Sequence, residues 1–177
     1  ESGGTILAAL NSGDIAWMLI SSALVLLMTP GLAFFYGGLV KRKNVINTIM
    51  SSIFVMGLAS VMWMFVGYSL SFSGDIGGII GNLNWFALNG VDALPGPYAG
   101  TIPNLCFAIY QMMFAIITPA LITGSVVERM KFSSLFVFVA VWSLCVYYPL
   151  AHMIWGGGFL QQLGVADFAG GVRESVR

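Results

Sequence analysis

The sequence predicts an all-α membrane protein, a bundle of about four helices that cross a bilayer. Hydrophobic residues make up 58% of the 177 residues and charged residues only 8%, whereas a soluble domain usually carries about a quarter charged residues. The charges are also segregated, because residues 15–40, 45–74, 105–127 and 132–166 contain none. A helix needs roughly 20 apolar residues to cross the hydrocarbon core, and these runs are long enough. The alternative is that these runs are large buried helices of a soluble protein. Four such runs in a chain of this length disfavour it.

Two short basic clusters orient the predicted helices. They lie at residues 41–43 and 129–131, after the first and the third uncharged run. The positive-inside rule makes such loops cytoplasmic. The other loops, roughly residues 73–102 and 152–167, hold aspartates but no Lys or Arg. We therefore expect a multi-pass protein of the plasma (inner) membrane with its N-terminus outside.

Caps and prolines predict where the helices begin and end. Ser12 and Asp14 are candidate caps for the first turn of the first helix, and Pro30 is expected to interrupt that helix. Pro149 is expected to end the fourth helix. The segment 73–103 is rich in Gly, Asn and Pro and is expected to form an extracellular loop. The predicted helices cover about residues 15–40, 45–72, 104–127 and 132–148, and the chain is expected to re-enter the membrane from residue 167.

The composition disfavours several classes of function. The net charge is zero, so nothing suggests a nucleic acid as partner. Cys106 and Cys145 lie inside apolar runs, where buried thiols are ordinary, so neither a disulfide nor a metal site is expected. The sequence shows no cluster of His, Asp and Glu and no arrangement around a nucleophile, so we expect neither an enzyme nor a cofactor.

Two stretches carry a more specific pattern. The first is TPGLAFFYGGLVKRKN at residues 29–44. The second runs ERMKFS at 128–133, AHMIWGGG at 151–158 and DFAGG at 167–171. In order and spacing they resemble the ammonium transporter (Amt/Mep/Rh) family, its Amt branch more than its Rh branch. The resemblance covers residues 1–171, which we interpret as a partial ammonium transporter domain.

The resemblance implies a fold and an activity. Members of the family are homotrimers, and each protomer has eleven helices around its own narrow pore, in two inverted halves of five plus one extra helix. This chain would supply the first half of that fold, helices one to four and the start of the fifth. Ammonium (or methylammonium) is recruited at an outer aromatic site and loses a proton, and a pore with paired histidines carries ammonia and the proton inward.

Three aromatic residues match positions near the cation path of the family. Trp155 matches the recruitment tryptophan, and an indole face attracts a cation electrostatically. The alternative for Trp155 is an anchor at the membrane interface. Phe114 matches the phenylalanine gate, and Tyr110 lies one turn above it on the same helix face and would help to bind the substrate. The alternative for this pair is ordinary packing or contact with lipid.

Polar residues of the motifs have structural and electrostatic interpretations. Asp167 matches an acidic residue that the family keeps near the cation site, where a buried carboxylate stabilises a cation at a distance. Its alternative role is the N-cap of the fifth helix. His152, the single histidine, does not match the pore histidines, and a structural hydrogen-bonding role is expected. For Glu128 and Arg129 in the short inner loop we expect packing or a salt bridge.

The end of the sequence departs from the family pattern. The first pore histidine follows the aspartate by eight residues, but that position holds Ser175. Residues 172–177 contain two arginines and a glutamate where an apolar fifth helix should begin, and we interpret them as an atypical tail. The leading hypothesis is the N-terminal part of an ammonium channel or transporter. The alternative is a non-transporting membrane sensor or anchor module derived from one.

Overall fold

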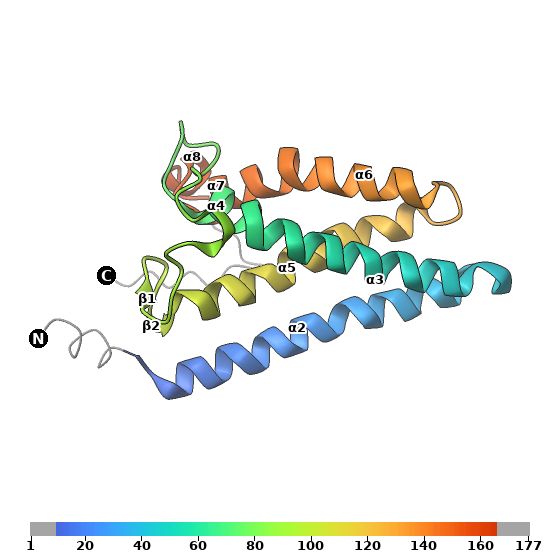
Figure 1. The fold of residues 1–177 in the computed structure, drawn as a ribbon, viewed down its shortest axis with the longest axis horizontal. Helices are drawn as coiled ribbons and strands as arrows, with labels where there is room; N and C mark the ends of the chain where they lie inside the picture. Colours follow the sequence, from blue (N-terminus) through green and yellow to red (C-terminus); the bar gives the residue numbers. More distant parts are fainter. Residues whose placement is uncertain (1–9, 166–177) are drawn as a thin grey trace, which may run out of the picture. The chain divides into compact units, whose positions relative to one another are not determined.

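The computed structural model describes residues 10–165, and most of them are helical (Figure 1). Among these residues four segments are long and apolar enough to cross a membrane, which confirms the number of spans predicted from the uncharged runs. The elements in chain order are α2 (Ser12–Leu39), a 3₁₀ turn (Arg42–Asn44), α3 (Val45–Met62), a π-helical turn (Trp63–Gly67), α4 (Tyr68–Phe72), a 3₁₀ turn (Phe86–Leu88), β1 (Pro95–Gly96), β2 (Ala99–Pro103), α5 (Asn104–Val126), α6 (Phe132–Trp142), a second π-helical turn (Ser143–Tyr147), α7 (Tyr148–Trp155) and α8 (Phe159–Gln162).

The chain divides into two compact units. The first unit comprises Glu1–Trp63 and Asp92–Val141, and the second comprises Met64–Val91 and Trp142–Arg177. The first unit therefore holds α2, α3, α5 and α6 with the two strands, and the second holds α4, α7 and α8 with the loop after α4.

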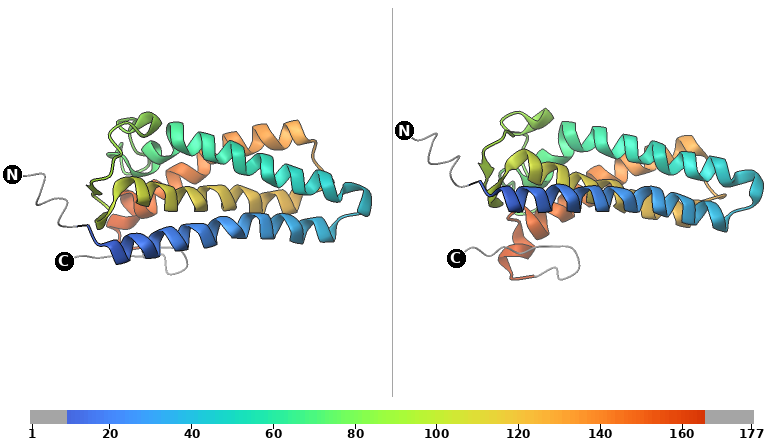
Figure 2. Two further views of the ribbon diagram at one scale, coloured as in Figure 1. Left: turned by 60° about the horizontal axis from the view of Figure 1, so that its bottom comes forward. Right: turned by 90° about the horizontal axis from the view of Figure 1, so that it is seen from below.

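The helices of the first unit pack closely because small residues lie at their contacts. Figures 1 and 2 show α2, α3 and α5 side by side. A Cβ atom on Gly124 of α5 would overlap the ring of Tyr36 on α2, and the Tyr36 hydroxyl donates a hydrogen bond to the Leu121 carbonyl at 3.2 Å. Glycine at such a position lets two membrane helices approach each other. Between α3 and α5 lies a core cluster of Ala59, Met113 and Ile116, and between α3 and α6 lies another of Val55, Leu135 and Val139.

The first helix begins at a different cap from those predicted, and it is not interrupted. Asn11, rather than Ser12 or Asp14, is the N-cap, since its side-chain oxygen accepts hydrogen bonds from two backbone amides of the first turn. Pro30 lies inside α2, which continues to Leu39. Proline removes one backbone hydrogen bond, but unwinding the chain inside a bilayer would expose several unpaired groups. Continuing the helix is the less costly outcome.

The fourth span also passes its proline, contrary to the prediction that it ends there. Pro149 lies in the first turn of α7, directly after the π-helical turn. A proline is tolerated at this position because its missing amide needs no partner, and the wider π turn changes the carbonyl register before it. The helix therefore continues from residue 148 to Trp155.

The long segment between the second and third spans is ordered by hydrogen bonds. In the first unit β1 pairs antiparallel with β2, a small sheet that the all-α prediction did not include. The Asn11 amide donates to the Thr101 carbonyl at 2.9 Å, which ties the start of α2 to β2. In the second unit the Ser73 hydroxyl donates to Asn82 Oδ1 at 2.6 Å, and the ring of Trp85 stacks on Tyr68 with centroids 5.4 Å apart.

The contact of Gly124 with Tyr36 gives a test of the packing in the first unit. We expect Gly124→Ala to destabilise the protein by about 1–3 kcal/mol, because the added methyl overpacks a full contact. Gly38→Ala is the matched control, since nothing lies within 4 Å of its Cβ position and alanine favours helix. Thermal unfolding in detergent measures both variants. Equal stability of the two would contradict the close contact.

Candidate functional site

The aromatic pair of α5 has the geometry that its spacing predicts. The rings of Tyr110 and Phe114 meet edge to face, with centroids 5.2 Å apart and an interplanar angle of 80°. Both side chains are half-buried, while Met113 and Ile116 on the same helix are buried in the core cluster with Ala59. The pair therefore lies on one helix face, as predicted. The gate role of Phe114 and the binding role of Tyr110 remain predictions.

Trp155 is the last residue of α7, and the glycines that follow it are required by close contacts. A Cβ on Gly156 would overlap the Ser71 carbonyl oxygen, and a Cβ on Gly158 would lie 2.5 Å from Met153 Cα. Gly157 has a φ of 93°, which favours glycine. The helix must therefore end here, which leaves the indole at a helix terminus. The recruitment role of Trp155 remains a prediction.

The indole of Trp155 is half-buried, and its Nε1 atom is buried without a hydrogen-bond partner among the described residues. A buried indole N–H needs an acceptor. An ammonium ion carries only donors, so it cannot satisfy this N–H. The part of Trp155 that suits a cation is the ring face.

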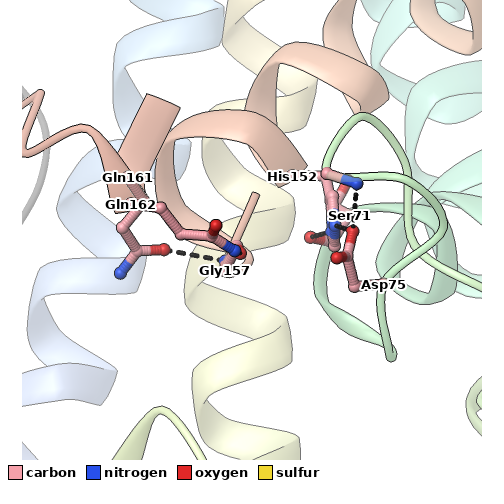
Figure 3. A network of polar contacts seen from close by, with 7 residues as sticks. Ser71, Asp75, His152, Gly157, Gln161 and Gln162 are labelled. Carbon is pink, nitrogen blue, oxygen red and sulfur yellow. Dashed lines mark hydrogen bonds and ion pairs between the residues drawn. The ribbon is translucent and has the colours of Figure 1, made fainter. Parts of the chain in front are cut away.

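Figure 3 shows a polar network in the second unit that joins α7 to the loop after α4. His152 is fully buried; its Nδ1 atom lies 3.0 Å from the Ser71 carbonyl oxygen and its Nε2 atom lies 3.1 Å from Asp75 Oδ1. The Gly78 amide donates to the same Asp75 oxygen at 2.7 Å. The hydrogen bond from His152, followed by that from Gly78, lowers the pKa of Asp75. The predicted hydrogen-bonding role of His152 is confirmed.

A second part of this network holds the glycine turn after Trp155 (Figure 3). The Gly157 amide donates to Gln161 Oε1 at 2.7 Å, and Gln162 Nε2 donates to the Gly157 carbonyl at 3.1 Å. The Phe159 amide donates to the Gly78 carbonyl at 2.9 Å. The segment that presents Trp155 is therefore fixed on both sides of the turn.

At one end of the first unit, Glu128 joins the two loops that carry the basic clusters. Its Oε1 atom accepts hydrogen bonds from Asn44 Nδ2 at 2.7 Å and from the Lys41 amide at 3.2 Å. The Asn44 bond, then the Lys41 bond, lowers the pKa of Glu128. Beside Glu128 lies a cavity of about 240 Å³, which is lined by polar side chains such as Asn47 and Thr48 and by apolar ones such as Val126 and Leu135. Glu128 thus packs through hydrogen bonds and, within residues 10–165, forms no salt bridge.

The predicted site residues fall in different parts of the chain. Tyr110 and Phe114 belong to the first unit and Trp155 to the second. Asp167, the tail 172–177 and Ser175 lie outside the described residues. Sequence reasoning did not assign Asp75 as the partner of His152. The signal was present, because Asp75 is the acidic residue of the loop that directly follows α4.

The described part of the chain contains no group of three or more His, Cys, Asp and Glu side chains that could hold a metal ion. The described residues of the two units hold half-buried aromatic rings and a hydrogen-bonded pair of the buried His152 and the exposed Asp75. The model of the Ammonium Transporter Family matches residues 16–173. The chain belongs to the ammonium transporter family.

Proteins of other organisms that are similar to this chain in sequence are named ammonium transporters. The chain is 57% identical over 166 residues to a putative ammonium transporter of Methanothermobacter thermautotrophicus, an alignment that covers 92% of this chain. It is 47% identical to the ammonium transporter Amt1 of Archaeoglobus fulgidus, again over 92% of this chain. The chain spans 40% of the length of the first relative and 39% of the second.

Solved structures show the same helical membrane fold. Mep2 of Candida albicans superposes with a TM-score of 0.82 at 33% identity, over 93% of this chain and 36% of that protein. A solved Sensor Amt Protein superposes with a TM-score of 0.80 at 25% identity, over 89% of this chain and 39% of that protein. The described spans therefore form the first part of the ammonium transporter fold in a multi-pass membrane protein.

The hydrogen bonds of Glu128 predict a pH-dependent contribution to stability. Its pKa is lowered in the folded state from an ordinary value of 4.5, so the folded state binds a proton less readily than the unfolded state. The contribution is therefore present above about pH 4.5 and is lost as the pH falls through the lowered pKa. Glu128→Gln removes the charge. We expect the wild type to be the more stable protein at neutral pH and this advantage to vanish in acid, measured by thermal unfolding. An advantage that is unchanged in acid would contradict the ionised contact.

Proposed function

We propose that this chain is the N-terminal part of an ammonium channel or transporter, in which Trp155 recruits the cation, Tyr110 helps to bind it and Phe114 acts as a gate. Membership of the family carries the proposal, together with aromatic faces at a helix end and on one face of α5. The substrate is ammonium or methylammonium, and the remaining helices are supplied by the rest of the protein.

Cation–π attraction explains why such residues suit the first step. An ammonium ion that leaves water loses hydrogen bonds, and an indole face offsets part of this cost by about 0.5–2 kcal/mol. The half-buried position of Trp155 suits this exchange, because the attraction is stronger when water is partly excluded. Asp167 would add long-range attraction for the cation, as a carboxylate in a low-dielectric environment does.

The proposed setting is the plasma membrane, with the N-terminus outside and the basic clusters inside. In the first unit, the loops that carry Lys41 and Glu128 meet at the same end of the bundle, so both clusters lie on one side, as the positive-inside rule requires. The family resemblance implies a homotrimer, which we propose for the full-length protein.

A second candidate function is a non-transporting membrane sensor or anchor module. The similarity to the solved Sensor Amt Protein favours it, as does Ser175 at the position where the family pattern has its first pore histidine. A sensor of this kind would bind the cation without moving it across the membrane. Methylammonium uptake at background level together with persistent binding would therefore select the sensor.

The test is uptake of labelled methylammonium by cells that express the full-length protein. We expect Trp155→Ala to raise the apparent KM by roughly 2- to 30-fold, the range that loss of a cation–π contact predicts. Trp155→Phe, which keeps an aromatic face, should lose less. Phe114→Ala should alter flux or selectivity.

Tyr110→Phe and Tyr110→Ala together test the binding role of Tyr110, because the first keeps the ring contact with Phe114 and removes only the hydroxyl. If the ring face binds the cation, we expect Tyr110→Ala to raise the apparent KM more than Tyr110→Phe does. Unchanged transport in both Trp155→Ala and Phe114→Ala would overturn the assignment of the site.

A further inference from the structure

The cavity beside Glu128 lies entirely within the first unit, at the end of the bundle where the two basic loops meet. Its polar lining residues are Asn44, Asn47, Thr48, Ser51, Thr123 and Glu128. Thr48 and Thr123 are buried whereas Asn47 and Glu128 are exposed, so the cavity runs from the solvent into the bundle. Neither Trp155 nor the aromatic pair of α5 lines it. It is therefore separate from the site proposed above.

The hydroxyl groups in this cavity have already used their protons. Each donates to a backbone carbonyl of the preceding turn of its own helix, Thr48 at 3.0 Å, Ser51 at 2.8 Å and Thr123 at 2.7 Å. A hydroxyl has one donor and two acceptor lone pairs, so these oxygens can still accept but have no proton left to donate. The polar part of the wall therefore suits a ligand that carries N–H donors.

Glu128 adds a negative charge that no basic side chain neutralises by direct contact. The hydrogen bond from Asn44, followed by that from the Lys41 amide, lowers the pKa of its carboxyl group, which is therefore ionised at neutral pH. Basic residues are frequent in the same two loops, at 41–43, 129 and 131. Within residues 10–165, however, none of them forms an ion pair with Glu128. The carboxylate is thus available to a cation from solution.

The remaining wall of the cavity is apolar and includes Val126, Phe132 and Leu135. Hard metal ions such as Ca²⁺ and Mg²⁺ take about six to eight oxygen ligands, which an apolar wall cannot supply. The cavity volume of about 240 Å³ is also much larger than the ~30 Å³ of one water molecule, so it has room for an alkyl group. An alkylammonium ion satisfies both parts of the wall, because its N–H groups donate to the oxygens and its carbon atoms leave water.

An anion is the competing occupant. Basic residues surround the cavity, and the N-termini of α3 and α6 favour negative charge. The Glu128 carboxylate already accepts the Lys41 and Asn44 amides before α3, however, and its charge repels a second anion. The C-terminus of α5, whose last residue Val126 lines the cavity, favours positive charge. Together with the hydroxyl oxygens, these features favour a cation.

We propose that this cavity is a second binding site, which takes a small primary ammonium ion, either ammonium itself or a short alkylammonium. Glu128 supplies the counter-charge, Thr48 and Ser51 supply acceptor oxygens, and the apolar wall contacts the alkyl group. The site stands on the geometry of the first unit and does not depend on the role of Trp155. In the proposed orientation it opens on the cytoplasmic side. Since Glu128 also joins the two loops, a bound cation stabilises that end of the bundle.

Binding is measured by thermal unfolding of the full-length protein in detergent at constant pH and ionic strength. A ligand that binds only the folded protein raises the Tm in a saturable manner. The measurement uses the Trp155→Ala background, so that the proposed recruitment site does not contribute. We expect a saturable rise with methylammonium chloride and none with potassium chloride. Ethylammonium should have a roughly two- to fourfold lower apparent Kd than methylammonium, because one more CH₂ group is buried.

Substitutions locate the bound ion, and the readout is the ligand-dependent shift rather than the Tm without ligand. Glu128→Gln keeps the side-chain shape and should abolish the shift. Asp92→Asn is its matched control, since Asp92 also accepts a backbone amide in the first unit, at 2.9 Å, but does not line the cavity. Ser51→Ala should raise the apparent Kd roughly three- to tenfold. Ser125→Ala should not, because the Ser125 hydroxyl donates to its own helix at 2.8 Å outside the cavity.

The outcomes are decisive for this site and separate it from the proposed function. The proposal is overturned by no saturable rise with either amine, by an equal rise with potassium, or by a rise with sodium sulfate instead, which would assign the cavity to an anion. A shift that persists in Glu128→Gln places the amine elsewhere and also overturns it. Absence of methylammonium uptake in the wild type, with the shift and its loss in Glu128→Gln intact, removes the proposed function and leaves this site.

Discussion

Inside a bilayer the backbone must satisfy its own hydrogen bonds, and this constraint decides most of the structure. Each unpaired amide or carbonyl in hydrocarbon is costly, so a span remains helical even where its sequence contains a proline. This explains why α2 continues through Pro30 and α5 through Pro119. The same constraint explains the π-helical turns at Trp63–Gly67 and Ser143–Tyr147, where the helix changes its hydrogen-bond register and remains a helix.

The same constraint applies to polar side chains within the spans, many of which hydrogen-bond to the backbone of their own helix. The hydroxyl of Ser22 donates to the Met18 carbonyl at 2.8 Å, and that of Thr118 donates to the Phe114 carbonyl at 2.7 Å. Such bonds to the preceding turn occupy the hydroxyl and leave the helix surface apolar. Within the described spans these hydroxyls are therefore not free donors, whereas the aromatic faces of α5 remain. Polar chemistry is left to the helix ends, where Glu128 and the His152–Asp75 pair lie.

The sequence predicted the features that depend on the length of an apolar run, namely the membrane spans. It did not predict which of several neighbouring residues caps a helix or which distant residues pair. Uncharged runs have a direct physical meaning, so the four spans and the limits of α5 agree closely with the structure. The cap at Asn11 was missed because three neighbouring residues are all good caps, and only the backbone geometry selects one. The rule that a proline ends a helix holds for soluble proteins, where water can replace the lost hydrogen bonds. Applied to the fourth span, it therefore placed the end of the helix wrongly at Pro149. The spacing of Tyr110 and Phe114 was enough to place them on one face, whereas the pairing of His152 with Asp75 joins residues 77 positions apart.

The position of Trp155 follows from the same constraint. Trp155 is the residue at which the helix stops, and the close approach of the Ser71 carbonyl makes glycine the residue that fits directly after it. Once the helix has ended, its last carbonyls need donors, and the amides of the glycine turn supply them to His152. The ring of that histidine then binds the neighbouring loop. The end of the helix, the position of the indole and the contact between His152 and the loop thus depend on the same set of hydrogen bonds.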